Sequence, residues 1–133
     1  MKTGMPCRFV IAIWASVALL ARIAGATDCT WDGSTGDWFD GAKWAGGVPG
    51  NGDTAIVNSG SVLLTNETAA TLAMLSMSGG TLTMSNWTTR IQATEVWITN
   101  SAQITLPPAF TNSVMSNRVW IVCSNLTLAA AAS

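Results

Sequence analysis

The chain has 133 residues, of which 49% are apolar and 10% are charged, and it contains no histidine. Residues 1–26 have the character of an export segment, and the remainder, 27–133, carries three basic and seven acidic side chains, a net charge of −4. A chain of this length forms one small domain at most. Three scattered cations exclude the basic stripe of a nucleic-acid-binding surface, and the absence of histidine removes the commonest general base and zinc ligand.

Residues 1–26 have the three-part order of a secretory signal peptide. Lys2 and Arg8 flank the start, an uninterrupted apolar run covers 9–21, and a small-x-small triplet ends at Ala26. The run is shorter than the ~20 residues that a membrane-spanning helix needs. We therefore expect cleavage after Ala26 and a mature chain that is secreted or held at the cell surface, with no stable membrane span.

The segment 27–52 is rich in glycine, aspartate and tryptophan, and it precedes the repetitive part of the chain, so we expect it to form an N-terminal cap. Its aspartates, Asp28, Asp32, Asp37 and Asp40, alternate with glycines. Flexible loops rich in oxygen ligands suit calcium, although this spacing does not fit an EF-hand. The alternative is that each carboxylate caps nearby backbone amides. Apart from calcium, no cofactor is indicated.

Residues 53–133 consist of short apolar runs separated by Ser, Thr, Asn and Gly, without helical periodicity, which predicts strands. Four segments have the pattern strand, polar turn, strand: 56–64, 75–84, 97–106 and 120–128. Their second strands place Val62, Leu82, Ile104 and Leu126 at nearly equal intervals along the chain. This period of about 20–22 residues is typical of stacked repeats. It predicts an all-β, right-handed parallel β-solenoid of about four rungs, each rung being one turn of the coil, with these four residues stacked inward. A β-sandwich is the alternative.

An open solenoid exposes unpaired strand edges at both ends, so natural ones carry caps. The sequence offers a cap before the first rung, whereas only residues 129–133 follow the last predicted strand. We therefore expect either a product truncated at its C-terminal side or a domain that stacks on another solenoid segment.

Three stretches carry a resemblance to known proteins: WFDGAKW at 38–44, GVPGNGDTAIV at 47–57 and GSV at 60–62. They resemble the opening of secreted bacterial β-helix surface proteins, the autotransporter-like and adhesin group. They are also similar to the start of the eight-glycine domain of cell-surface β-helix proteins. The likeness covers about residues 31–65. It implies a β-helix that works at a cell surface, and it does not imply a particular activity.

Six tryptophans remain after residue 26, and exposed indole rings stack on sugars. Trp87, flanked by polar residues, is the best candidate for an exposed ring, and Trp38 and Trp44 are further candidates for carbohydrate binding. The alternative for the latter two is that they fold onto an apolar end of the coil. Trp97 and Trp120 occupy equivalent strand starts, and we expect them to stack on each other in the core.

The titratable residues do not form a recognisable catalytic group. Glu67 and Glu95, the only glutamates, fall at different places in the repeat, which disfavours the paired carboxylates of a glycosidase. Arg90 lies near Glu95 in sequence, where a solvated ion pair is expected. We predict a non-enzymatic structural or adhesive segment whose partners are surface glycans or other solenoid segments. The alternatives are a glycan-binding module and the inert N-terminal part of a larger polysaccharide-active β-helix enzyme.

Two cysteines, Cys29 and Cys123, remain after the predicted signal peptide. Their even number favours a disulfide. In a solenoid, however, three inter-strand steps of ~4.8 Å would separate them by more than the ~7 Å that a disulfide spans. We predict free thiols, and a bridge would favour the sandwich.

Overall fold

The computed structural model describes residues 25–108 and 114–129. The predicted signal peptide lies, except for its last two residues, outside this range. No helix within the described residues is long and apolar enough to span a membrane.

The described chain forms ten strands and one short 3-10 helix, η1 (Gly41–Lys43). The strands are β1 (Asp28–Trp31), β2 (Thr35–Asp37), β3 (Trp44–Ala45), β4 (Thr54–Val57), β5 (Ser61–Leu64), β6 (Thr71–Met77), β7 (Thr81–Met84), β8 (Ile91–Ile98), β9 (Gln103–Thr105) and β10 (Ile121–Leu128). Sheet A has the order β10-β8-β6-β4-β1-β3 and sheet B the order β2-β5-β7-β9. Every pairing is parallel except that of β1 with β3.

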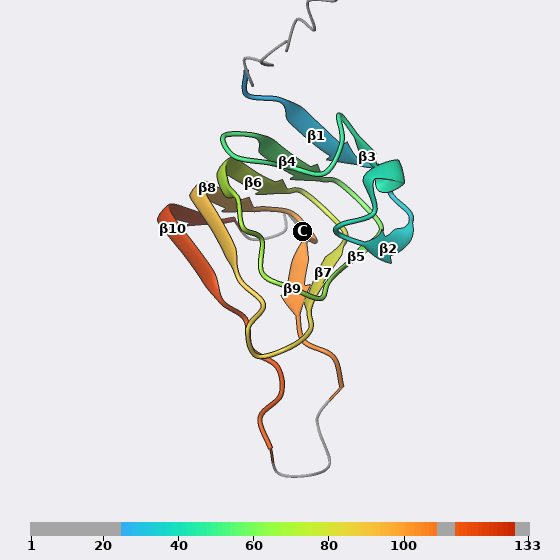
Figure 1. The fold of residues 1–133 in the computed structure, drawn as a ribbon, viewed down its shortest axis with the longest axis vertical. Helices are drawn as coiled ribbons and strands as arrows, with labels where there is room; N and C mark the ends of the chain where they lie inside the picture. Colours follow the sequence, from blue (N-terminus) through green and yellow to red (C-terminus); the bar gives the residue numbers. More distant parts are fainter. Residues whose placement is uncertain (1–24, 109–113, 130–133) are drawn as a thin grey trace, which may run out of the picture.

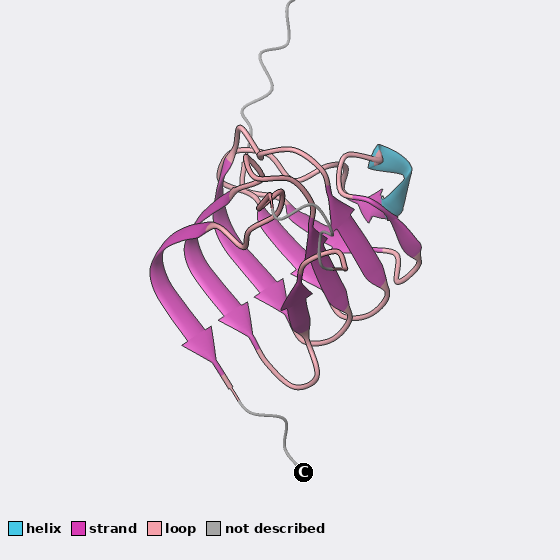
Figure 2. Cartoon of the chain, turned by 90° about the horizontal axis from the view of Figure 1, so that it is seen from below, coloured by secondary structure: helices cyan, strands magenta, loops and turns pink. Residues whose placement is uncertain are grey.

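This topology is a parallel β-solenoid (Figures 1 and 2). Each rung contributes one strand to sheet A and the next to sheet B, in the pairs β1–β2, β4–β5, β6–β7 and β8–β9, and β10 then adds a further strand to sheet A. The predicted solenoid of about four rungs is confirmed. The sandwich alternative is wrong, because strands consecutive in sequence lie in different sheets and pair with their counterparts one rung away.

Apolar side chains from successive rungs form columns inside the coil. One column of sheet A contains the buried residues Cys29, Ala55, Leu75 and Val96. In sheet B, Val62 and Leu82 are buried in register, and Ile104 packs against them. Burying each large aliphatic side chain contributes about 1.5–3 kcal/mol, so the columns supply much of the stability of the fold.

The predicted stack of Val62, Leu82 and Ile104 is therefore confirmed, but the inclusion of Leu126 is wrong. Residues Ile121–Leu128 form one strand, and Leu126 is in register with Val96 of sheet A. The physical reason is at the expected turn. Asn125 remains extended, without a positive φ, and its side-chain amide donates a hydrogen bond to Oε1 of Glu95 on the neighbouring strand (2.6 Å).

The segment 27–52 is more than a cap. Its strands β1 and β2 pair in parallel with β4 and β5, and so form the first rung. The capping elements are η1 and β3, the latter lying antiparallel along the outer edge of β1. Figure 1 shows both elements at the end of the coil where the described chain begins.

Glycines in the left-handed region turn the chain from sheet A into sheet B. Gly60 has a φ of +82° and Gly80 a φ of +74°, and these corners stack because Thr81 N donates to Gly60 O (2.9 Å). A Cβ added to Gly60 would lie 2.4 Å from the carbonyl oxygen of Gly33 in the rung before it. Only glycine satisfies both the conformation and the close approach.

Candidate functional site

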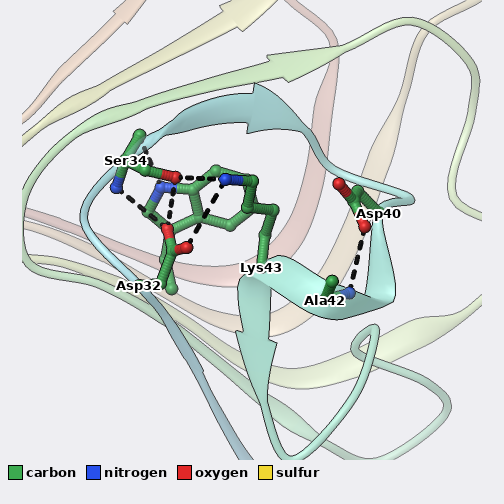
Figure 3. A network of polar contacts seen from close by, with 6 residues as sticks. Asp32, Ser34, Asp40, Ala42 and Lys43 are labelled. Atoms are coloured by element: carbon green, nitrogen blue, oxygen red, sulfur yellow. Dashed lines mark hydrogen bonds and ion pairs between the residues drawn. The ribbon is translucent and has the colours of Figure 1, made fainter.

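A polar network lies between η1 and the corner at residues 32–34, which leads from β1 to β2 (Figure 3). Oδ1 of Asp32 accepts hydrogen bonds from the backbone N–H (2.9 Å) and the hydroxyl (2.6 Å) of Ser34. Nζ of Lys43 donates to Oγ of Ser34 at 2.9 Å and lies 3.6 Å from Oδ2 of Asp32. The hydrogen bonds from Ser34, and then the charge of Lys43, lower the pKa of Asp32.

A serine hydroxyl beside a lysine amine is an arrangement seen in some nucleophilic enzymes, but the polarity here is unsuitable. Ser34 donates its hydroxyl proton to Asp32, and the Lys43 ammonium donates to the same serine oxygen. The amine therefore does not receive the proton that a nucleophilic serine must lose. The network instead fastens the corner at residues 32–34 to the capping element.

The predicted calcium ligands do not converge. Asp37 accepts hydrogen bonds from Phe39 N and Thr65 Oγ1, and Asp40 accepts from Ala42 N. The described residues contain no group of three or more acidic, cysteine or histidine side chains arranged to hold a metal ion. The calcium interpretation of Asp28, Asp32, Asp37 and Asp40 is therefore not supported. The alternative, in which aspartates cap local amides, describes Asp32, Asp37 and Asp40.

Two of the three predicted sugar-binding tryptophans are in the interior. Trp38 is 0% exposed and Trp44 is 4% exposed, and their rings meet edge to face with centroids 4.9 Å apart. Trp31 packs on Trp44 in the same way, at 5.1 Å. Nε1 of Trp44 donates to the carbonyl oxygen of Trp38 (2.7 Å). Neither Trp38 nor Trp44 presents a ring face to a ligand, which corrects the carbohydrate-binding prediction for both and confirms that they close an apolar end of the coil.

Trp87 is 44% exposed, as predicted, and belongs to an alternating series of rings and cations. The guanidinium of Arg118 lies 4.8 Å from the ring centroid of Trp87 and 3.9 Å from that of Trp120. The guanidinium of Arg90 lies 5.2 Å from Trp120 and bonds to Glu67 at 3.2 Å. We call these five residues the Trp–Arg ladder. Each ring–cation contact contributes about 0.5–1 kcal/mol at an exposed site.

Comparison with known protein families identifies a match. The profile of the G8 domain matches residues 43–127, which is more than half of the chain. The chain belongs to the G8 domain family. No curated protein and no solved structure matches it. The resemblance to the eight-glycine domain is thus confirmed over rungs two to four and β10.

The Trp–Arg ladder brings together three loops of this G8 domain that the sequence does not connect. Glu67 follows β5, Trp87 and Arg90 follow β7, and Arg118 and Trp120 precede β10. The expected ion pair of Arg90 with Glu95 is wrong, because Arg90 pairs with Glu67 and Glu95 accepts a hydrogen bond from Asn125. The long segment between β9 and β10 interrupts the repeat of about 20–22 residues. The spacing of residues in the sequence therefore does not show that Arg118 and Trp120 lie beside Trp87 and Arg90. The ladder thus presents a partly exposed indole ring, that of Trp87, with the guanidinium of Arg118 against it.

Trp97 and Trp120 do not stack, which corrects the prediction made from their equivalent positions in the repeat. Trp97 lies near the end of β8, in register with Ser76 and Thr127, and it is 45% exposed. Trp120 immediately precedes β10, level with Arg90. The prediction assumed a turn within the fourth repeat segment, 120–128, which would put the two rings at equivalent positions of neighbouring rungs. The structure has one continuous strand there.

Cys29 and Cys123, the cysteines within the described residues, are free thiols, as predicted. Cys29 is on β1 and Cys123 on β10, and three strands of sheet A lie between them. Four inter-strand steps of ~4.8 Å separate the two strands by about 19 Å, far beyond the reach of a disulfide. Burial, and then the charges of Asp53 and Asp28, raise the pKa of the Cys29 thiol.

Proposed function

We propose that this G8 domain is a non-enzymatic, exported β-solenoid segment with a structural or adhesive role outside the cell or at its surface. The observation that supports this role is the use of its carboxylates. The acidic side chains that accept hydrogen bonds or form ion pairs are Asp32, Asp37, Asp40, Asp53, Glu67 and Glu95. Each binds a loop, a corner or a neighbouring strand, so the charged groups serve the architecture.

Expression of the full chain in a host with a secretory pathway tests the proposed export. We expect the protein outside the cytoplasm with Thr27 as its first residue, measured by N-terminal sequencing. An uncleaved chain retained in the cytoplasm would contradict this part of the proposal. Incubation of the purified protein with a panel of polysaccharides, followed by assays for new reducing ends and unsaturated products, tests the absence of catalysis.

The Trp–Arg ladder favours glycan binding as the second candidate. An exposed ring supplies the flat apolar face on which a sugar stacks, and the adjacent guanidinium of Arg118 supplies hydrogen-bond donors for hydroxyl or acidic groups. The ladder is thus the surface at which adhesion to a glycan is best supported.

A matched pair of variants tests this candidate on a glycan array. Trp87 and Trp97 are exposed to nearly the same extent, 44% and 45%, but only Trp87 lies against a cation. We expect W87A to remove binding and W97A to retain it. Equal retention in both variants would contradict a role for the ladder, and equal loss would indicate a binding surface elsewhere or general unfolding, which circular dichroism distinguishes.

A further inference from the structure

The last strand of sheet A has an open edge. Among the strands that the structure describes, β10 has one neighbour, β8. Its inward-facing residues continue the interior columns, and Leu126 and Leu128, in register with Val96 and Ile98, are 53% and 67% exposed. The edge is also unprotected, because β10 contains no charged residue and no proline, the devices that commonly block the addition of another strand.

The free hydrogen-bonding groups of this edge follow from the bonds that are already made. Trp120 O accepts from Ile91 N (3.1 Å), and Ala129 N donates to Ile98 O (3.0 Å). The residues that flank β10 at both ends therefore point their backbone groups toward β8. Because these groups alternate along a strand, those of Ile121 and Leu128 point toward the open edge.

The inward and outward positions of β10 have a matching symmetry. Three residues of β10 face inward because they are in register with buried residues of β8: Ile121, Cys123 and Leu126. Leu128 also faces inward, in register with Ile98. Two neighbouring residues at the centre, 124 and 125, both face outward. The order is therefore in-out-in-out-out-in-out-in, which is the same when it is read in either direction.

We propose that β10 is a docking edge for a second copy of this chain, paired antiparallel across a two-fold axis. In this register Ile121 lies opposite Leu128 of the other copy, and Cys123 lies opposite Leu126. Every inward residue then faces an inward residue, and the open backbone groups form hydrogen-bonded pairs. The interior columns of sheet A then continue from one coil into the other, whereas sheet B ends at β9 in each copy.

The opposite end of the molecule supports this arrangement over head-to-tail stacking. There β3 already occupies the outer edge of β1, and the buried rings of Trp31, Trp38 and Trp44 close the interior. An incoming β10 would have to displace them. The open end can therefore meet only another open end, and two-fold association of this kind closes after two copies.

The size of the surface sets the strength of the interaction. Only the edge of sheet A meets the other copy, because sheet B ends one rung earlier, at β9. A strand of eight residues at ~3.3 Å each, in a sheet about 10 Å deep with its side chains, defines an edge about 26 Å by 10 Å. Two copies would bury roughly 500 Å² in total, which is in the range of weak, transient contacts. We expect a weak, reversible dimer that forms at high protein concentration. The absence of charged residues in β9 and β10 means that like copies do not repel each other there.

Analytical ultracentrifugation of the full chain over a wide range of concentrations measures the association. We expect a monomer–dimer equilibrium for the parent. L126K, which puts a charge at an inward position of the edge, should remain monomeric, and T127K, with its charge on the outer face of the same strand, should still dimerise. Circular dichroism checks that each variant retains its sheets.

Disulfide trapping tests the register in a chain that also carries C7S, which removes the one cysteine of the predicted signal peptide. In the proposed pairing the Cα atoms of Cys123 and position 126 of the other copy are about 5.5 Å apart, within the range for a disulfide. Within one chain the same two positions are about 10 Å apart along the strand. L126C should therefore form a covalent dimer under mild oxidation, and T127C, whose side chain faces outward, should not.

A parent that stays monomeric at all concentrations would overturn the proposal. So would equal association of L126K and T127K, equal crosslinking of L126C and T127C, or growth of the parent into longer assemblies. The last result would mean that the open end accepts the capped end, or a strand in another direction.

Discussion

Replacing Gly60 with alanine perturbs the stacking of rungs at a single atom. Gly60 has a φ of +82°, and a Cβ there would lie 2.4 Å from the carbonyl oxygens of both Gly33 and Ser34. A left-handed conformation costs a non-glycine residue about 1–2 kcal/mol. The clash must also lengthen the hydrogen bond from Ser61 N to Ser34 O, now 2.9 Å, and losing such a bond costs about 0.5–1.5 kcal/mol. We expect G60A to lower the free energy of unfolding by about 1.5–3.5 kcal/mol.

G52A is the matched control. Gly52 has a φ of +78°, and a Cβ there would have no atom within 4 Å. This variant carries the conformational cost alone, so it should lose only about 1–2 kcal/mol. For a domain of this size each kcal/mol lowers the melting temperature by about 4–8 °C. Thermal and urea unfolding followed by circular dichroism measure both variants. If G60A and G52A unfold together, close packing of the corners does not stabilise the coil, and the steric reasoning is refuted.

Three further variants or treatments test the core, the thiols and the polar network. L82D puts an unpaired carboxylate into the buried column at a cost of several kcal/mol, and melting like that of the parent would exclude the stack. Alkylation should modify Cys123 well before Cys29, whose pKa is raised by burial, and non-reducing peptide mapping should find no crosslink between them. The lowered pKa of Asp32 gives stability that is present above its unfolded pKa of about 3.9 and is lost as the pH falls through the folded value. D32N should therefore lose less stability than the parent between about pH 5 and pH 2 in urea titrations, and equal losses would rule out the charged network with Ser34.

The solenoid can be predicted because its signals are local and repeated. Apolar residues alternate along each strand, and corner residues that tolerate a positive φ separate the strands at nearly constant intervals. The inward positions of Val62 and Leu82 follow from these signals alone. Rungs two to four obey the pattern, and there the predicted coil and the inward stack of Val62, Leu82 and Ile104 agree with the structure.

The first rung cannot be recognised in the sequence because it fills its interior differently. Gly36 occupies the column position held by Val62 and Leu82 in the next two rungs. The side chains of Trp31 and Lys43 cover it, at 3.4 Å and 3.3 Å from where a Cβ would be. Because the ring of Trp31 fills the space at Gly36, the first rung has no apolar residue at the position that repeats in the later rungs. The repeat therefore cannot be seen there in the sequence.

The candidate site can be predicted only at Trp87. Its partner Arg118 is distant in sequence, beyond an excursion that breaks the period. The burial of Trp38 and Trp44 depends on how η1 and β3 return over the first rung, a tertiary contact that composition does not reveal. Exposure of a ring can therefore be judged for a residue in a regular corner, but not for residues in the cap.

The position of the closed end has a consequence for how the protein is made. The cap and the first rung lie within residues 28–45, so they are synthesised before the other rungs and, if the chain is exported amino-terminus first, they also emerge first. Each later rung needs only the one before it as a template, because each strand pairs with its counterpart in the preceding rung. Folding can therefore proceed as ordered growth from one end, without waiting for distant segments. Protease protection in a series of nascent chains of increasing length should advance rung by rung from the cap.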